Sequence, residues 1–217
     1  MTKYEIFKEI LLILYYIASI GLVVGVFIGI KQLKVMKSDV ETKNKRAAVD
    51  KSIEFLNWFA TEFIPENSEK EKKLDKDKII IMENKELQYF NIKELAILGG
   101  FKPEKITSSV KEKYRCEIVT LTNQLEFFSA AMNTGLADEQ MAFNPLASTF
   151  CKFVEDNYDL YCYLRNGNEE TLFNNTIDLY LIWKSRLNAI ELVRKKVEIE
   201  EQLSKVTVKS IPILGKE

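Results

Sequence analysis

The fold is decided by the stretch "ILLILYYIASIGLVVGVFIGI", residues 10–30, which contains no charged side chain. At about 1.5 Å per helical residue, this run reaches across the roughly 30 Å hydrocarbon core of a bilayer. The alternative is a secretory signal peptide, whose apolar region is usually about 7–15 residues long and leads into a small-x-small cleavage site. The run here is longer and continues into "KQLKVMK" without such a site. We therefore predict a retained transmembrane helix over residues 10–30.

The charges on either side of this helix predict its orientation. Residues 1–9 carry two lysines that are offset by two glutamates. Six cations follow the span closely: Lys31, Lys34, Lys37, Lys43, Lys45 and Arg46. Because positively charged flanks stay in the cytoplasm, we expect residues 1–9 to be a short extracytoplasmic N-terminus and everything after residue 30 to be cytoplasmic.

Glycines recur at every fourth position inside the apolar run. They are Gly21, Gly25 and Gly29, and Ala18 extends the series by one turn. In water a helical glycine costs about 1 kcal/mol relative to alanine, but in lipid small residues at this spacing let helices approach closely. The next apolar run, residues 79–82, is too short to be a second span. We therefore predict that the stripe contacts another copy of the same helix, giving a homo-oligomer of open copy number; the alternative is that the glycines only loosen a lone anchor.

The composition excludes several classes of function. The 217 residues include 31 Lys+Arg against 32 Asp+Glu, so no overall field favours nucleic acid. Histidine is absent, which excludes Ser-His-Asp and Cys-His nucleophiles and histidine zinc sites. The cysteines Cys116, Cys151 and Cys162 form no C-x-x-C pair. We predict that they are buried reduced thiols, as a reducing cytoplasm allows, with Cys151 and Cys162 on one helix face.

The rest of the chain has helical periodicity and turn signals rather than strand alternation. Residues 31–46 predict a basic helical stalk, residues 47–205 a cytosolic helical bundle of about four or five main helices, and residues 206–217 an irregular tail. The predicted fold class is therefore all-α. The charged segment 66–78 predicts a solvated loop or an exposed helix face, and "KIIIM", residues 78–82, leaves a short strand and a buried turn open.

Local signals predict where the helices begin and end. Pro65 should end the first cytosolic helix, because proline removes a backbone donor. A short helix is expected to begin at Asn84 and to end at Gly99–Gly100, and a long helix to run from Pro103 to Gly135. A third helix is expected to begin at Asn144–Pro145 and to end at residues 166–168. The last helix is expected from about Glu169 to Leu203. In the last helix the residues predicted to point inward include Leu172, Leu179, Trp183, Leu187, Ile190 and Val197.

The sequence contains no recognisable catalytic motif. Walker and G-x-G-x-x-G loops are absent, so we expect no cofactor. Asp156 and Asp159 are spaced to share a helix face and to hold a hard cation, but a solvated acidic face is the favoured alternative, and we predict no metal site. Arg165 is expected in the last turn of a helix, where it favours the helix dipole. The sequence favours a protein that is not an enzyme.

Two segments carry a resemblance to a known family. They are "RAAVDKSIEFLNWF", residues 46–59, and "NQLEFFSAAMNTGLADEQMAFNPLASTFCKFVEDNYDLYCYLR", residues 123–165. They resemble an uncharacterised bacterial family of single-span inner-membrane proteins with a basic stalk and an all-α cytosolic domain. Its pattern is Asn-x-x-Glu, a glycine turn leading to aspartate, and a helix that closes on arginine. The resemblance marks four candidate functional residues: Asn123, Glu126, Asp138 and Arg165.

The layout is also similar to the membrane accessory proteins of type VI-B CRISPR systems, in which a helical domain on one span assembles into a pore and strengthens phage defence. That domain is likened to the HEPN ribonuclease fold, whose active motif pairs arginine with a following histidine. Because this chain has no histidine, the resemblance implies a HEPN-like fold without its catalysis. It implies a self-associating antiphage effector that forms a pore or depolarises the inner membrane. The alternatives are a tether whose domain binds a signal or a defence-system partner protein, and, least favoured, a ribonuclease.

Overall fold

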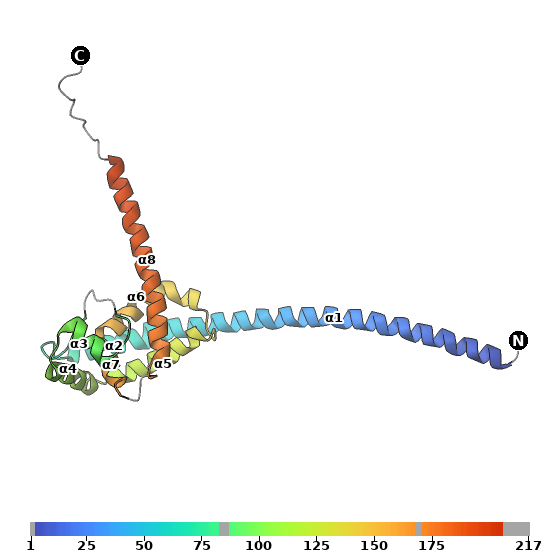
Figure 1. Ribbon diagram of the computed structural model, residues 1–217, viewed down its shortest axis with the longest axis horizontal. Helices are drawn as coiled ribbons and strands as arrows, with labels where there is room; N and C mark the ends of the chain where they lie inside the picture. The colour runs from blue at the N-terminus through green and yellow to red at the C-terminus, as the bar shows by residue number, and fades with distance from the viewer. Residues whose placement is uncertain (1–2, 83–86, 168–170, 206–217) are drawn as a thin grey trace, which may run out of the picture. The chain divides into compact units, whose positions relative to one another are not determined.

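The computed structural model describes residues 3–82, 87–167 and 171–205, and all regular secondary structure in these ranges is helical (Figure 1). The predicted all-α fold is therefore confirmed. The chain divides into two compact units, one up to Ala48 and one from Val49 on. Helix α1 (Lys3–Trp58) makes up the first unit and enters the second, which contains the bundle.

The first cytosolic helix does not end at Pro65, so that prediction is wrong. After α1 comes a π-helical turn, Phe59–Phe63, and then α2 (Ile64–Lys73). At the end of the π turn the N–H of Ile64 donates to the carbonyl oxygen of Phe59, five residues earlier. Pro65 thereby falls in the first turn of α2, where a missing N–H removes no intrahelical bond. The π turn accommodates the proline without interrupting the helical path.

Helix α3 (Ile92–Gly99) begins later than predicted. Its N-cap is Asn91, whose side chain accepts the N–H of Glu94 at 2.8 Å. Asn84, the predicted cap, lies outside the described residues. The predicted glycine stop is confirmed, because Gly100 follows the helix with φ +60°, a left-handed conformation that favours glycine.

Two predicted long helices are each divided. The helix expected from Pro103 to Gly135 is split into α4 (Pro103–Arg115) and α5 (Ile118–Asn133), with Glu117 between them at φ +57°. The boundary expected at Asn144–Pro145 is also wrong. Helix α6 (Glu139–Asp156) begins earlier, carries Pro145 inside, and is followed by α7 (Tyr158–Leu164). The last helix, α8 (Asn174–Lys205), begins five residues after the predicted Glu169, which lies outside the described residues.

A chain of aromatic rings forms the centre of the bundle. The ring of Phe59 lies 4.9 Å from that of Phe128, centroid to centroid, and Phe128 lies 6.0 Å from Trp183. Trp183 in turn contacts Phe150 of α6 at 5.1 Å and is fully buried. Edge-to-face pairs of this kind add about 0.5–1.5 kcal/mol beyond the area they bury. They join the π turn, α5, α6 and α8 into one core.

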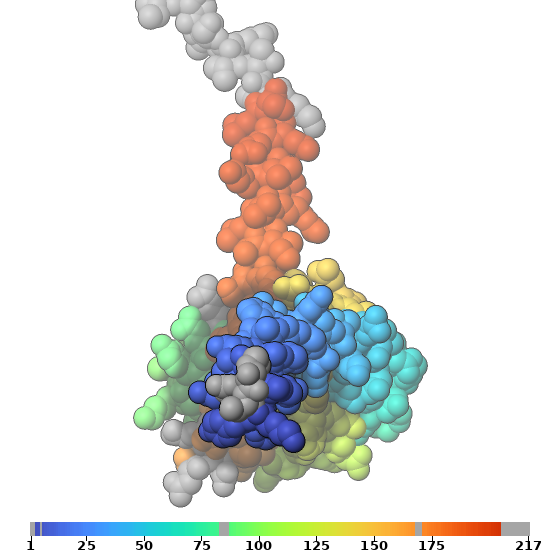
Figure 2. Space-filling view, turned by 90° about the vertical axis from the view of Figure 1, so that its right-hand side faces the viewer, coloured from blue at the N-terminus to red at the C-terminus, as the bar shows by residue number. Residues whose placement is uncertain are grey.

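Helix α8 is buried only in its N-terminal half. Leu179 and Trp183 point inward as predicted and Leu187 is partly buried, but Ile190 and Val197 are 50% and 49% exposed. Leu172, before the helix, is also 37% exposed. The inward prediction is wrong at Leu172, which lies before the helix begins at Asn174. It is also wrong at Ile190 and Val197, because the apolar period of α8 continues beyond the elements it packs against. Figure 2 shows this part of α8, in red, clear of the bundle surface.

The charged segment after Pro65 forms the exposed helix α2 and a short turn. Its ion pairs include Lys73 with Glu69 at 2.5 Å, so the prediction of an exposed helix face is confirmed. Lys70 is the exception, since it is buried and its ammonium contacts Glu117 at 3.2 Å. Residues 79–82 form no strand: Ile80 is buried, and its N–H donates to the Ser109 hydroxyl at 2.9 Å.

Glu112 fastens this segment to α4. Its carboxylate accepts the N–H of Asp75 at 3.0 Å and the guanidinium of Arg115 at 2.5 Å. Arg115 also donates to the carbonyl oxygen of Lys73 at 2.8 Å. The hydrogen bonds from Arg115 and from the Asp75 N–H lower the pKa of Glu112 from 4.5 to about 2. The ionised carboxylate therefore stabilises the fold.

Replacing Glu112 by glutamine should destabilise the protein in a pH-dependent way. Because the pKa is 4.5 when unfolded and about 2 when folded, the stabilisation is complete above about pH 4.5 and is lost as the pH falls towards 2. Urea unfolding of detergent-solubilised wild type and Glu112→Gln should show curves that converge over this range. Glu104→Gln, an exposed glutamate of the same helix, should show no such convergence. If the difference in free energy of unfolding between wild type and Glu112→Gln were the same at about pH 3 as at neutral pH, the stabilising role of the ionised Glu112 carboxylate would be contradicted.

Candidate functional site

The apolar part of α1 is exposed along its whole length. Its large apolar side chains between Ile10 and Ile30 are 49% to 70% exposed. Among the described residues, α1 contains one stretch long and apolar enough to cross a membrane, and none of that stretch is buried. A continuous apolar surface of this size is not sustained in water, so lipid or another protein has to cover it.

The predicted interface residues lie on this exposed helix. A Cβ added to Gly21, Gly25 or Gly29 would meet no atom of the described chain within 4 Å. Close packing within the chain therefore does not explain these glycines. Each step of four residues turns the helix face by about 40°, so the glycines form a gently winding stripe, and Ala18 extends it on the N-terminal side.

Two residues marked by the resemblance, Glu126 and Arg165, meet at the beginning of α8. The Glu126 carboxylate accepts the backbone N–H groups of Asn175 at 3.2 Å and Thr176 at 2.9 Å, and both of their side chains at 2.8 Å. Arg165 donates to the carbonyl oxygen of Leu172 and, at 2.8 Å, to the side chain of Asn174. A carboxylate at a helix N-terminus satisfies free N–H groups and favours the helix dipole. Glu126 and Arg165 therefore fix the start of α8.

The other two marked residues lie elsewhere. Asp138 is the N-cap of α6, where its carboxylate accepts the N–H of Met141 at 3.1 Å. Its backbone N–H also donates to the Ser52 hydroxyl oxygen at 2.7 Å, and that hydroxyl donates to the Asp138 carbonyl oxygen at 3.0 Å. Asn123 lies on the exposed side of α5. The four residues therefore do not converge on one site, and three of them hold the beginnings of helices.

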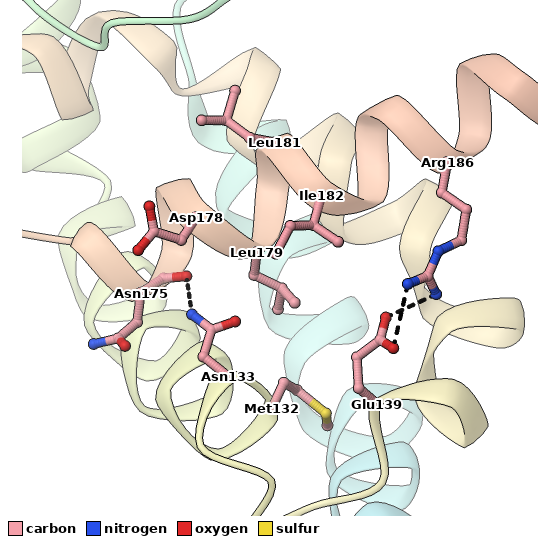
Figure 3. Close-up of a pocket in the computed structure, with 9 residues that line it drawn as sticks. All are labelled: Met132, Asn133, Glu139, Asn175, Asp178, Leu179, Leu181, Ile182 and Arg186. Carbon is pink, nitrogen blue, oxygen red and sulfur yellow. Dashed lines mark hydrogen bonds and ion pairs between the residues drawn. The ribbon is translucent and has the colours of Figure 1, made fainter.

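A groove of about 750 Å³ lies among α5, α6 and the first half of α8. Figure 3 shows its polar wall, in which Glu139 accepts the guanidinium of Arg186 at 2.9 Å. Glu139 also accepts the indole N–H of Trp183 at 2.5 Å, and Arg186 lies 4.4 Å above the ring of Phe143. Sequence reasoning missed this groove, because its residues come from helices far apart in the chain. Asp138-Glu139, as a dense acidic pair, was the one available signal.

The groove is lined by both polar and apolar side chains. Glu139 and Arg186 are paired in its wall (Figure 3). The remaining lining consists of four apolar residues, Met132, Leu179, Leu181 and Ile182, and three polar ones, Asn133, Asn175 and the exposed Asp178. A smaller cavity of about 490 Å³ lies beside Arg165, Lys93 and Tyr89.

The acidic pair weighed as a cation site is engaged with lysines. Asp159 and Lys113 form a buried ion pair at 2.5 Å, each side chain 1% exposed, and Ser109 donates to Asp159 at 2.5 Å. Asp156 pairs with Lys152 at 2.8 Å and lies in α6 rather than α7, so the two carboxylates do not share a helix face. No group of three metal-ligating side chains occurs among the described residues. The buried pair fastens α4 to α7.

The cysteines are free and buried, as predicted. Cys151 lies in α6 and Cys162 in α7, so they do not share one helix face. Burial raises the pKa of the Cys151 thiol to about 12. Because the thiolate is the nucleophile, a thiol of this kind is inert at neutral pH.

The structure defines an all-α protein with one long apolar N-terminal helix. Over residues 18–183 the chain matches the family model of DUF4760, a domain of unknown function, and it belongs to that family. No curated protein and no solved structure matches it. The match gives no link to the accessory proteins of type VI-B CRISPR systems. It begins at Ala18, so the family unit contains the glycine stripe and the stalk as well as the bundle.

Removing the carboxylate that caps α8 should destabilise the bundle. Glu126→Ala deletes the acceptor of four hydrogen bonds, so the free energy of unfolding should fall by about 1–3 kcal/mol. The matched control is Glu198→Ala, at an exposed glutamate later in the same helix, which should change stability by less than about 0.5 kcal/mol. Denaturant unfolding of the full chain in detergent, followed by tryptophan fluorescence, measures both. Equal losses in the two variants would contradict the capping role.

Proposed function

We propose that this protein is a membrane anchor that self-associates through the glycine stripe of α1 and holds its helical domain on the cytoplasmic side of a bacterial inner membrane. The observation that carries the proposal is the free space around Gly21, Gly25 and Gly29 within the chain. Small residues at this spacing let two helices in lipid pack with their backbones close together.

The proposed orientation is supported by charge and by cysteine chemistry. The segment after Ile30 carries six cations before residue 47, whereas the lysines of residues 1–9 are offset by glutamates. A membrane protein keeps its basic flank in the cytoplasm. The three buried free thiols belong to the unit on that side and suit a reducing compartment.

The site geometry supports assembly and docking rather than catalysis. Glu126, Asp138 and Arg165 are engaged at helix beginnings, and the chain has no histidine to complete a HEPN-type pair. The groove lined by Glu139 and Arg186 offers the cytosolic unit a place to bind a partner or a signal. This feature favours the tether as the second candidate function.

The resemblance implies that the protein forms a pore in antiphage defence. A pore requires more of the transmembrane helix than an anchor does. A water-filled path needs a polar helix face. Between residues 10 and 30 the sequence has no charge, and the hydroxyl of Ser19 donates to the carbonyl oxygen of Tyr15 at 2.8 Å. We therefore favour an assembly of tightly paired helices over one that encloses a wide channel. An antiphage role would act through the same assembly.

Leucine on the glycine stripe should weaken the assembly without disturbing the chain itself. Gly25→Leu adds bulk where no atom of the described chain lies within 4 Å, so only contact between copies is affected. We expect the self-association constant in detergent to fall at least about tenfold. Mass measurement by light scattering over a range of detergent concentrations tests this.

Val23→Leu provides the matched control, because Val23 lies in the same turn of α1 and points away from the stripe at about 100° per residue. It should leave the mass unchanged. A wild-type chain that is monomeric throughout, or a Gly25→Leu chain that associates like wild type, would refute self-association through this face.

A further inference from the structure

Helix α1 continues without a break beyond the apolar run and carries a second exposed apolar series there. Its members are Leu33, Met36 and Val40, which are 67%, 62% and 54% exposed. They lie within the first compact unit, before the bundle begins at Val49. These side chains alternate with the lysines of the basic segment that begins at Lys31, beyond the end of the apolar run at Ile30.

This series lies on the side of α1 that the winding glycine stripe reaches at Gly29. At about 100° per residue, Leu33 lies about 40° from Gly29 around the helix axis, and Met36 and Val40 lie about 20° to either side of it. Because α1 is unbroken from Lys3 to Trp58, these angular positions around the helix axis apply from the span into the stalk. Lys31 and Lys34 lie on the opposite side, at about 140–200°.

Lipid does not cover the far end of the stalk series. Val40 follows Ile30 by about 15 Å along a helix axis, whereas the headgroup layer beyond the hydrocarbon core is only about 5–8 Å deep. The spacing from Leu33 to Met36 to Val40 is three and then four residues, the a–d–a spacing of a coiled coil. A partner helix that runs alongside α1 fits this face.

We propose that the partner is a second copy of this chain, forming a parallel, in-register helix pair that extends from the glycine stripe through the stalk to Val40. The inference rests on the self-association proposed above. The bilayer holds two copies with the same direction and depth, so equivalent residues of the two stalks face each other. The next core position after Val40 is Lys43, where facing ammonium groups repel. The paired segment therefore ends before the bundle begins.

Cysteine cross-linking of full-length chains in membranes tests this pairing. Single cysteines replace Leu33, Met36 or Val40 on the proposed face, and Lys34, Ser38 or Thr42 on the opposite face as matched controls. The native thiols are buried, and the wild-type chain measures their background. Under mild oxidation, cysteines on the proposed face should give disulfide-linked dimers at least about fivefold faster than the controls, because facing core positions approach within disulfide distance.

The same membranes distinguish this inference from the proposed function. Light scattering that shows oligomers, together with equal cross-linking on the two stalk faces, would overturn the stalk pairing and leave association in the span intact. Monomeric chains without cross-links above the wild-type background would refute both. If cysteines at Lys34, Ser38 and Thr42 formed disulfide-linked dimers faster than those on the proposed face, the contact would lie on the opposite face and the inference would also be overturned.

Discussion

The structure depends on one constraint: the apolar surface of α1 between Ile10 and Ile30 has to be kept from water. Nothing in the described bundle covers it, since none of this stretch is buried. Its length matches the hydrocarbon core of a bilayer, and a helix satisfies its own backbone groups there. In lipid the glycines no longer weaken the helix by exposure to water, and we propose that their stripe is a surface for a second helix. The proposed direction of the chain, with the bundle in the cytoplasm, rests on the flanking lysines.

The second compact unit is held by aromatic packing and by polar side chains that fix the helix ends. Phe128 and Trp183 join the π turn to α5 and α8. Glu126 fixes the beginning of α8, and Asp138 fixes the beginning of α6. The residues that the resemblance marks are thus explained largely by architecture. The groove beside Glu139 and the exposed apolar face of the stalk are two surfaces of the described residues to which we assign binding only as proposals.

Sequence periodicity predicted the helical class, the apolar span and the buried thiols, because these depend on composition and on repeating patterns. It placed helix boundaries less well. Pro65 was expected to end a helix and Pro145 to begin one, but a π turn accommodates the first and an earlier N-cap at Asp138 starts the helix that contains the second. Glu117 breaks a helix without a glycine or proline signal. The groove and the pair of Lys113 with Asp159 depend on contacts between distant segments, which no local pattern encodes.

Extraction of membranes at alkaline pH tests the central claim most directly. Such treatment opens vesicles and releases proteins held by surface charge, whereas a helix inserted in the hydrocarbon core remains with the lipid. The full-length chain should stay in the membrane pellet and leave it only when detergent is added. Release of the intact chain into the alkaline supernatant would contradict insertion of α1, and the exposed apolar surface between Ile10 and Ile30 would then have to be covered by protein instead.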